Sequence, residues 1–257
     1  MQRYEESISV RSYDADHVGR VKPSSLFNYF QEVAWHHAEV LGFGYEALLS
    51  HNLFWVISRI QLEWDHPLHW GDEVTIETWP KGIVKLFAMR DFIVRTSDGV
   101  EAVRATSSWL TLDLESKRPR RPDRVMDTSL LNVDDHAISE FPAKLSVPEE
   151  LSHTDTRHVR YSDLDVNKHV NNARYVDWLF DAFPLNANAS MLFNRLNVQF
   201  TGEARYGAEL NVHTDPPKQT DTRVPADTGD GASPAFAAII NRENGAHVCD
   251  AGVVLGR

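Results

Sequence analysis

A run of polar residues near the middle of the chain carries the side-chain types that acyl-transfer chemistry needs. A carboxylate, a carboxamide and an imidazole stand at every second position, as Asp165, Asn167 and His169. In an extended stretch this spacing points all three side chains to one side. A helical pattern begins near Ala173, and the first turn of a helix has backbone N–H groups without intrahelical partners. These groups together predict an acyl-transfer centre with an oxyanion site.

A purely structural interpretation of this segment is also open. Asn171 or Asn172 could cap the following helix, because asparagine is a favoured N-cap residue. Short motifs of this kind also occur by chance. The surrounding sequence therefore has to decide between a polar loop and a reactive site.

The sequence is duplicated. Residues 11–16 match residues 160–165, and further along residues 59–64 match residues 195–200 in the same order. The helical region between these blocks is longer in the first copy than in the second. Two matching blocks in the same order indicate a duplicated unit and not a short-period solenoid.

Each copy has the pattern of one helix followed by several strands. The first helix is expected at residues 26–41, with Ser24 or Ser25 able to cap its start, and a short helical turn near residues 45–49. Strands are predicted at residues 54–64, 73–81, 85–96 and 100–114. In the second copy the helix is expected at residues 175–183, and the strands at residues 191–200, 209–214, 235–242 and 247–255. A helix and an antiparallel sheet segregated in each copy predict an α+β fold.

Composition indicates a folded globular protein. Hydrophobic residues make up 42% and charged residues 25% of the chain. Residues 214–234 are dense in Pro, Asp, Thr and Gly and predict a long mobile hairpin loop. No stretch approaches about 20 apolar residues, so no membrane span is expected. The N-terminus has no signal-peptide pattern, and the single Cys249 fits a reducing compartment, which points to the cytoplasm.

The sequence predicts neither a cofactor nor a metal. His36, His37 and His51 do not form a known metal-ligand pattern with an acidic partner. No glycine-rich phosphate loop or dinucleotide fingerprint is present. The net charge of −11 argues against a nucleic acid as partner.

Several further motifs lie along the chain. They are Tyr13-Asp14-Ala15-Asp16, Trp64-Asp65-His66-Pro67, Trp70-Gly71-Asp72, Glu77-Thr78-Trp79-Pro80, and Trp109-Leu110-Thr111-Leu112-Asp113-Leu114 leading into Lys117-Arg118-Pro119-Arg120-Arg121-Pro122. With the paired copies and residues 165–172, they resemble the acyl-ACP thioesterases over nearly the whole chain. Because no transit-peptide-like extension precedes these motifs, the chain is similar to the bacterial branch of that family.

The resemblance implies a fold and an activity. The fold would be a tandem (double) hot-dog, in which each unit wraps an antiparallel sheet around a long central helix. Residues 1–125 would form an acyl-binding unit, residues 126–152 a linker and residues 153–257 the unit with the catalytic residues. The implied reaction belongs to fatty acid biosynthesis: hydrolysis of fatty acyl-acyl carrier protein, which releases free fatty acid and ends chain elongation.

The resemblance also implies the catalytic residues, which are Asp165, Asn167, His169 and Glu203. In plant members a cysteine follows the glutamate, but here the next residue is Ala204, and Cys249 matches no catalytic position. A cysteine nucleophile is therefore not expected. The chemistry is expected to use carboxylates, an amide, an imidazole and water.

The internal repeat tests this assignment. Aspartate occurs in both copies, as Asp16 and Asp165. The other three positions differ, with Val18, Arg20 and Pro67 in the first copy where the second copy has Asn167, His169 and Glu203. If the motif were only a structural cap, both copies should keep similar chemistry. The asymmetry favours one active site per chain.

Two mechanisms remain open. In the first, His169 and Glu203 hold and deprotonate a water molecule, and Asp165 orients His169. In the second, Asp165 attacks the carbonyl carbon and forms a transient anhydride. In either case the Asn167 amide and a backbone N–H near Val170 or Asn171 are expected to stabilise the oxyanion. Asp163 is interpreted as a turn residue.

Substrate binding is predicted from apolar residues and from charge. The acyl chain would contact large apolar residues of the first copy, namely Leu26, Phe27, Phe30, Val33, Trp35 and residues 54–57. Acyl carrier proteins are acidic, so a chain of net charge −11 needs local positive charge to bind one. The main candidate cluster is Lys117, Arg118, Arg120, Arg121 and Arg124, and two smaller candidates are Arg20 with Lys22 and Lys81 with Lys85.

Alternative functions are an acyl-CoA thioesterase, since CoA is also polyanionic, and a non-catalytic acyl-binding protein of the same fold. A monomer or a homodimer would fit, because two fused units already supply the pairing that single hot-dog units obtain by dimerisation.

Overall fold

The computed structural model describes residues 3–148, 150–183, 193–215 and 235–255. The chain divides into two compact units, Met1–Lys144 and Leu145–Arg257, which are called here the first and the second unit. Residues 216–234 of the predicted hairpin loop lie outside the described residues. In the described part of the chain, no helix has the length and apolar character that crossing a bilayer requires.

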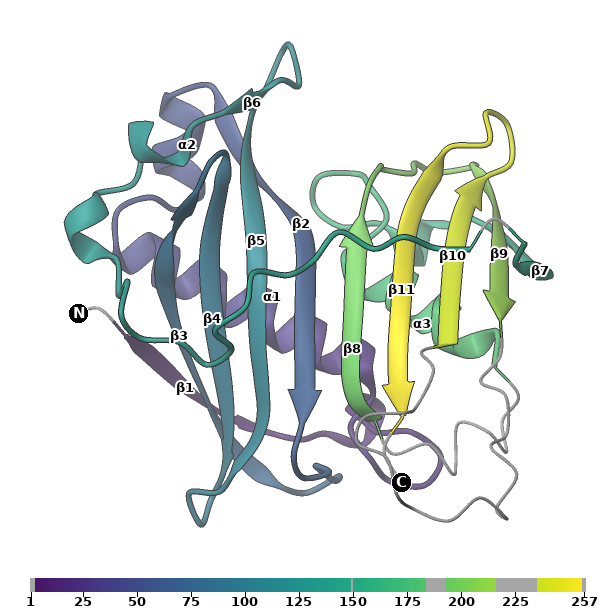
Figure 1. Cartoon of the computed structure of the whole chain (residues 1–257), viewed down its shortest axis with the longest axis horizontal. Helices are drawn as coiled ribbons and strands as arrows, with labels where there is room; N and C mark the ends of the chain where they lie inside the picture. Colours follow the sequence, from purple (N-terminus) through teal and green to yellow (C-terminus); the bar gives the residue numbers. More distant parts are fainter. Residues whose placement is uncertain (1–2, 149, 184–192, 216–234, 256–257) are drawn as a thin grey trace. The chain divides into compact units, whose positions relative to one another are not determined.

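The first unit is an antiparallel sheet with a long helix on one face (Figure 1). The strand order is β1-β3-β4-β5-β2, and the short β6 pairs with β5. The elements are β1 (Tyr4–Ser9), α1 (Pro23–Val40), α2 (Tyr45–Ser50), β2 (Leu53–Trp64), β3 (Glu73–Val84), β4 (Phe87–Thr96), β5 (Glu101–Asp113) and β6 (Pro119–Arg120), with 3-10 turns η1 (Ser12–Asp14), η2 (Pro122–Arg124) and η3 (Thr128–Leu130). The predicted helix and strands of the first copy are therefore confirmed.

Helix α1 begins at Pro23, three residues earlier than predicted, and without a serine cap. Lys22 is the N-cap, and Pro23 occupies the first helical turn, where its missing N–H is not needed. The Ser25 hydroxyl instead donates to the carbonyl of Asp14 at 3.0 Å. The prediction that Ser24 or Ser25 caps the helix is therefore wrong, because proline sets the start of the helix.

The buried face of α1 packs on β1 and β3 and forms the core of the first unit. The rings of Phe30 on α1 and Phe92 on β4 stack with their centroids 4.6 Å apart. Trp35, by contrast, is 48% exposed. Trp35 therefore lies on the outer side of α1, and this position does not support the prediction that it contacts the acyl chain.

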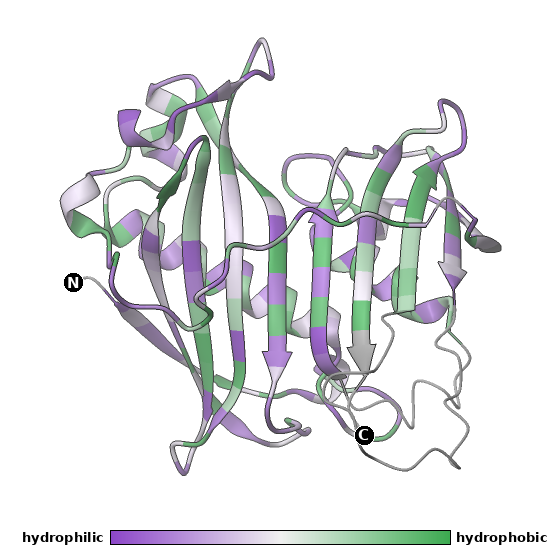
Figure 2. Ribbon diagram, in the orientation of Figure 1, coloured by the Kyte–Doolittle hydropathy of each residue, from purple (hydrophilic) through white to green (hydrophobic). Residues whose placement is uncertain are grey.

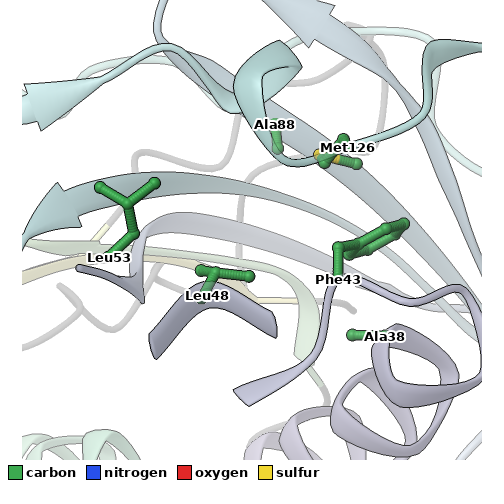
Figure 3. Close-up of a cluster of buried hydrophobic side chains, with 6 residues drawn as sticks. All are labelled: Ala38, Phe43, Leu48, Leu53, Ala88 and Met126. Carbon is green, nitrogen blue, oxygen red and sulfur yellow. The ribbon is translucent and has the colours of Figure 1, made fainter. Parts of the chain in front are cut away.

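A second apolar cluster closes one end of the first unit. Figure 3 shows its buried side chains, Ala38, Phe43, Leu48, Leu53, Ala88 and Met126. They come from α1, the turn before α2, α2, two strands and the segment that follows β6. The cluster joins the short α2 and the start of that segment to the sheet.

Residues 126–144, which the sequence analysis assigns to a linker, pack on the first unit. The Asp91 carboxylate on β4 accepts a hydrogen bond from the backbone N–H of Ala137 at 2.7 Å. The same carboxylate forms a buried ion pair with Lys81 Nζ at 3.1 Å. Trp79 Nε1 donates to the carbonyl of Asp135 at 2.9 Å. Buried polar groups on the strands thus hold the segment.

The second unit repeats the architecture with a shorter helix. Its strand order is β8-β11-β10-β9-β7, with α3 packed on β9 and β10. The elements are β7 (Ser152–His158), the 3-10 turn η4 (Tyr161–Asp163), α3 (Asn172–Asp181), β8 (Phe193–Phe200), β9 (Glu209–Asp215), β10 (Ala235–Asn241) and β11 (His247–Leu255). The α+β prediction is confirmed. The sequence analysis missed β7, because its polar sequence lacks the apolar periodicity of a buried strand.

Figure 2 shows the periodicity that the remaining strand predictions rest on. Hydrophilic and hydrophobic residues alternate along part of β2 and most of β8. Successive side chains of a strand point to opposite faces of the sheet, so one set enters the core and the other faces away from it. This alternation is the reason why the strand positions could be predicted in both copies.

Candidate functional site

The polar motif of the second unit forms a tight turn. Leu164 and Val170 form a bridge at its base. Within it, the backbone N–H of Asp165 donates to the carbonyl of His169 at 2.8 Å, and the N–H of Lys168 donates to the carbonyl of Asp165 at 3.0 Å. Lys168 has φ +64°, in the left-handed region. The prediction of an extended stretch with three side chains on one side is therefore wrong.

Asp165 stabilises this turn through its carboxylate. Oδ1 accepts the backbone N–H of Asn167 at 2.8 Å and that of His169 at 3.2 Å. Oδ2 lies 3.4 Å from the side-chain nitrogen of Asn167. Aspartate commonly closes turns in this way, which explains why the segment bends instead of extending. The hydrogen bond from Asp165 to His169 is made with the backbone of the histidine and leaves its ring free to face elsewhere.

The imidazole of His169 pairs with Glu203 from a second loop. His169 Nε2 lies 3.3 Å from Glu203 Oε2, and the two side chains are 20% and 48% exposed. The other carboxylate oxygen of Glu203 accepts from Arg205 at 3.1 Å. A backbone hydrogen bond of 2.9 Å from Val170 to the carbonyl of Ala204 joins the two loops. The fold thus assembles an imidazole–carboxylate pair from residues far apart in the sequence.

The four predicted site residues gather in two contacts. Asp165 contacts Asn167, and His169 contacts Glu203. Asn167 is exposed, so its amide can reach a bound molecule. The arrangement places a base and an amide donor on neighbouring residues of one turn.

The backbone donors expected at the start of α3 are already engaged. The N–H of Val170 donates to Ala204, and the N–H of Asn171 donates to the carbonyl of Asp163 at 2.9 Å. The prediction that one of them forms an oxyanion site is therefore wrong, since each completes a loop contact. Asn171 is the N-cap of α3, and its Oδ1 accepts from Ala173 at 2.8 Å.

Tyr175 contributes to the site, although the sequence analysis placed it only on the apolar face of the helix. Its hydroxyl accepts the backbone N–H of Ala204 at 3.0 Å, and the side chain is buried. Burial raises the pKa of this hydroxyl. Since Ala204 follows Glu203 directly, Tyr175 anchors the loop that carries the carboxylate. A tyrosine at a core position was the available signal, because a buried hydroxyl needs a partner.

Asp163 and Cys249 have structural surroundings. Asp163 lies in the turn η4, as predicted, and its buried carboxylate accepts from the N–H of Arg160 at 2.8 Å and from Arg174 at 3.3 Å. Cys249 is fully buried on β11, and burial raises the pKa of its thiol. A buried, protonated thiol is a poor nucleophile.

The first unit contains the same turn without the reactive side chains. Asp16 Oδ1 accepts the backbone N–H of Val18 at 3.0 Å and that of Arg20 at 2.8 Å. Gly19, with φ +84°, takes the place of Lys168. Arg20 pairs with the carboxylate of Asp16 at 3.1 Å. The aspartate is therefore a turn-forming residue in both units, and the two turns differ in the residues around it.

The described side chains offer no metal site. Among the residues that the structure describes, no three His, Cys, Asp or Glu side chains gather as a group that could hold a metal ion.

Both halves of the chain match one protein family. Residues 1–129 match the model of the acyl-ACP thioesterase N-terminal domain, and residues 147–250 match that of the acyl-ACP thioesterase C-terminal domain. Over 219 residues, or 78% of this chain and 52% of the relative, the sequence is 32% identical to the chloroplastic palmitoyl-acyl carrier protein thioesterase of Gossypium hirsutum. It is 30% identical over 200 residues, or 70% and 55%, to the oleoyl-acyl carrier protein thioesterase 1 of Arabidopsis thaliana. The chain thus spans about half the length of these curated relatives.

Solved structures show the same fold. The acyl-ACP thioesterase of Bacteroides thetaiotaomicron superposes with a TM-score of 0.86 at 24% identity, covering 99% of this chain and 98% of that one. The 12:0-ACP thioesterase of Umbellularia californica gives a TM-score of 0.83 at 22% identity, covering 100% and 98%. These proteins have a double hot-dog fold, so the predicted tandem hot-dog is confirmed.

Proposed function

Because this chain belongs to the acyl-ACP thioesterase family, we propose that it hydrolyses the thioester of fatty acyl-acyl carrier protein, releasing free fatty acid and ending chain elongation. The observation that carries the proposal is the pairing of His169 Nε2 with Glu203 Oε2 beside the exposed Asn167. The first unit keeps the turn but lacks these three residues. Retention of the reactive set in one unit supports a single active site per chain.

The geometry favours water as the nucleophile. Glu203 accepts a hydrogen bond from the Nε2–H of His169 and orients the ring, and the other ring nitrogen takes a proton from a water molecule held beside it. The oxygen of this water adds to the thioester carbonyl, whose oxyanion receives a hydrogen bond from the Asn167 amide. The tetrahedral intermediate then expels the thiolate of the carrier, which takes the proton back from the imidazole. The products are the free acid and the carrier thiol.

Asp165 has a positioning part in this scheme. Its Oδ1 already accepts two backbone N–H groups, and donors of this kind stabilise the carboxylate and lower its reactivity toward a carbonyl. The covalent route through an anhydride would have to break these hydrogen bonds and open the turn. We therefore assign to Asp165 the role of holding the turn that carries Asn167 and His169.

Substrate binding follows the same proposal. The acyl chain would bind in the first unit, where Leu26, Phe27 and Phe30 on the sheet-facing side of α1 are buried. The buried free thiol of Cys249 fits a reducing compartment such as the cytoplasm. An acyl-CoA thioesterase and a non-catalytic acyl-binding protein are the competing functions.

The test is thiol release from acyl-ACP and from acyl-CoA of matched chain lengths, with His169→Ala beside the parent enzyme. We expect turnover of acyl-ACP to exceed that of acyl-CoA, and kcat/KM to fall about 100-fold or more in the variant, as for the loss of a general base. The control is Arg20→Ala, which changes the equivalent position of the first unit and should leave His169 and Glu203 paired.

The outcomes separate the three functions. If acyl-CoA were turned over as fast as acyl-ACP, the assignment of acyl carrier protein as the acyl donor would be wrong. The proposed hydrolysis of a thioester would still stand. No thiol release from either substrate would contradict the enzyme assignment, and acyl-chain binding would then be measured directly. If His169→Ala left kcat/KM unchanged, the imidazole would have no part in the mechanism.

A further inference from the structure

The loops around the His169–Glu203 pair form one continuous rim. Two backbone hydrogen bonds join the end of β7 to the loop before β9: Gly207 donates to Val159 at 3.0 Å, and Val159 donates to Ala208 at 2.9 Å. The hydrogen bond between Val170 and Ala204 joins the same loop to the catalytic turn. Residues 159–170 and 201–208 are called here the site rim.

Positive charge lies on the outer side of the site rim. Its cations are Arg160, Lys168 and Arg205, and all three are exposed. Among the described residues, no carboxylate forms an ion pair with Arg160 or Lys168. Both side chains are exposed to solvent.

The carboxylates of the site rim have partners within the second unit. Asp163 is buried and pairs with Arg174 at 3.2 Å, and Asp165 accepts backbone N–H groups. Glu203 lies between His169 and Arg205. The negative charges thus have partners within the loops, whereas the cations of Arg160 and Lys168 face outward.

Large apolar side chains are interspersed with these cations. Tyr161 is 87% exposed, Val166 is 96% exposed and Tyr206 is 67% exposed. Exposed apolar residues that gather with charges around a site mark interaction surfaces. Aromatic residues together with arginine are also the residue types enriched in protein–protein interfaces.

We propose that the site rim is the docking surface for the acidic carrier protein, with Arg160 and Lys168 contacting its carboxylates and Tyr161, Val166 and Tyr206 its apolar side chains. This inference rests on the proposed function. At a net charge of −11 the chain as a whole repels an acidic partner, so docking requires a local surface where outward charge is positive. The site rim provides it next to the group that must reach the thioester.

The basic cluster of the first unit fits this role less well. Arg120 pairs with Asp113 at 3.1 Å, and Arg121 pairs with Asp123 at 2.8 Å. Lys117 lies over the ring of Phe54, with Nζ 4.6 Å from the ring centroid. Arg118 and Arg124 are exposed and provide a matched comparison for Arg160 and Lys168.

The experiment compares two double charge reversals in the full chain. The first is Arg160→Glu with Lys168→Glu, and the control is Arg118→Glu with Arg124→Glu, which changes the net charge equally. The kcat/KM is measured for acyl-ACP, for acyl-CoA and for the N-acetylcysteamine thioester of the same acyl chain. At low salt we expect the ratio of acyl-ACP to small-thioester turnover to fall at least about fivefold in the first variant, and this difference to shrink as salt is raised. In the control the ratio should stay within about twofold.

Each other outcome overturns the inference. An unchanged ratio in the rim variant, or an equal fall in the control, would assign docking elsewhere. An equal fall for acyl-CoA would show that the rim recognises phosphate groups and not a protein. A parent enzyme that cleaves the small thioester but not acyl-ACP would contradict the proposed function. Titration of the parent and of the rim variant with acyl-free carrier protein would then still measure whether the site rim binds the carrier.

Discussion

At the scale of single residues, the proposed mechanism separates groups that react from groups that hold them in place. His169 and Glu203 face each other through ring nitrogen and carboxylate oxygen. Asp165 contacts backbone N–H groups, and the first unit uses Asp16 in the same way. An aspartate present in both units therefore has a structural explanation that does not depend on catalysis.

This distinction predicts the behaviour of Asp165→Asn. The amide oxygen of asparagine can still accept the two backbone N–H groups, so the turn should persist and kcat should fall by less than about tenfold. If Asp165 attacked the carbonyl carbon, the same change would remove the nucleophile and lower kcat by about 1,000-fold or more. Single-turnover hydrolysis separates the two values, and Asp16→Asn is the matched change in the first unit. Loss of activity in an Asp165→Asn protein of unchanged stability would favour the covalent route.

At the scale of elements, helix α3 and the loop before β9 depend on each other. Tyr175 reaches from the helix to the N–H of Ala204, and Val170 at the base of the catalytic turn donates to the carbonyl of the same residue. Ala204 is therefore held from both sides. Because Glu203 precedes it, these two hydrogen bonds set the position of the carboxylate relative to the imidazole.

Removal of the Tyr175 hydroxyl tests this coupling. Tyr175→Phe leaves the buried N–H of Ala204 without its acceptor, which should lower the free energy of unfolding by about 1–3 kcal/mol. We expect kcat to fall several-fold, on the order of 3–10-fold, with KM little changed, because the misplaced group acts on the reaction and not on binding. Urea unfolding and steady-state kinetics measure both effects. The exposed Tyr45→Phe is the control, and an equal effect there would argue against the coupling.

At the scale of the whole molecule, the segment after β6 covers part of the sheet of the first unit. Asp91 is buried and is held by Lys81 and by the N–H of Ala137. Burial raises the pKa of the Asp91 carboxyl, and the Lys81 ammonium opposes this shift. A polar anchor under an irregular segment satisfies backbone groups that the segment itself cannot pair.

Lys81→Met tests how strongly the buried charge of Asp91 affects stability. Removing one partner of a buried pair leaves the Asp91 carboxylate uncompensated, so the free energy of unfolding should fall by about 3–5 kcal/mol at neutral pH. Since the folded-state pKa is raised, the folded protein binds this proton more tightly than the unfolded chain does. The loss should therefore shrink as the pH is lowered through that pKa and the carboxyl becomes neutral.

Chemical unfolding at several pH values measures the effect of Lys81→Met. The exposed Lys144→Met serves as the control, with an expected change within about 0.5 kcal/mol. The double variant Lys81→Met with Asp91→Asn should recover most of the stability, because it removes both charges and keeps an acceptor for the N–H of Ala137. A pH-independent loss in the single variant would mean that packing, and not the carboxylate, is responsible.

The local pattern of the sequence was sufficient for most of the elements and for the polar motif at residues 165–169. The period of two in the strands and the period near four in α1 are local properties, and so is the cap at Asn171. The duplication also exposed the site, because it compared two versions of one unit within the chain. Asp165, Asn167 and His169 stand out by their spacing, whereas Glu203 could be predicted only through the resemblance to a known family.

Only the tertiary structure decided how these residues meet. The turn at Asp165, the pairing of His169 with Glu203 and the contact of Tyr175 with Ala204 depend on hydrogen bonds between loops that strand pairing brings together. The same bonds engage the N–H groups of Val170 and Asn171 that the sequence left as oxyanion donors. A sequence records periodicity along the chain, whereas the partner of a polar group is set by which distant segments the packed core places beside it.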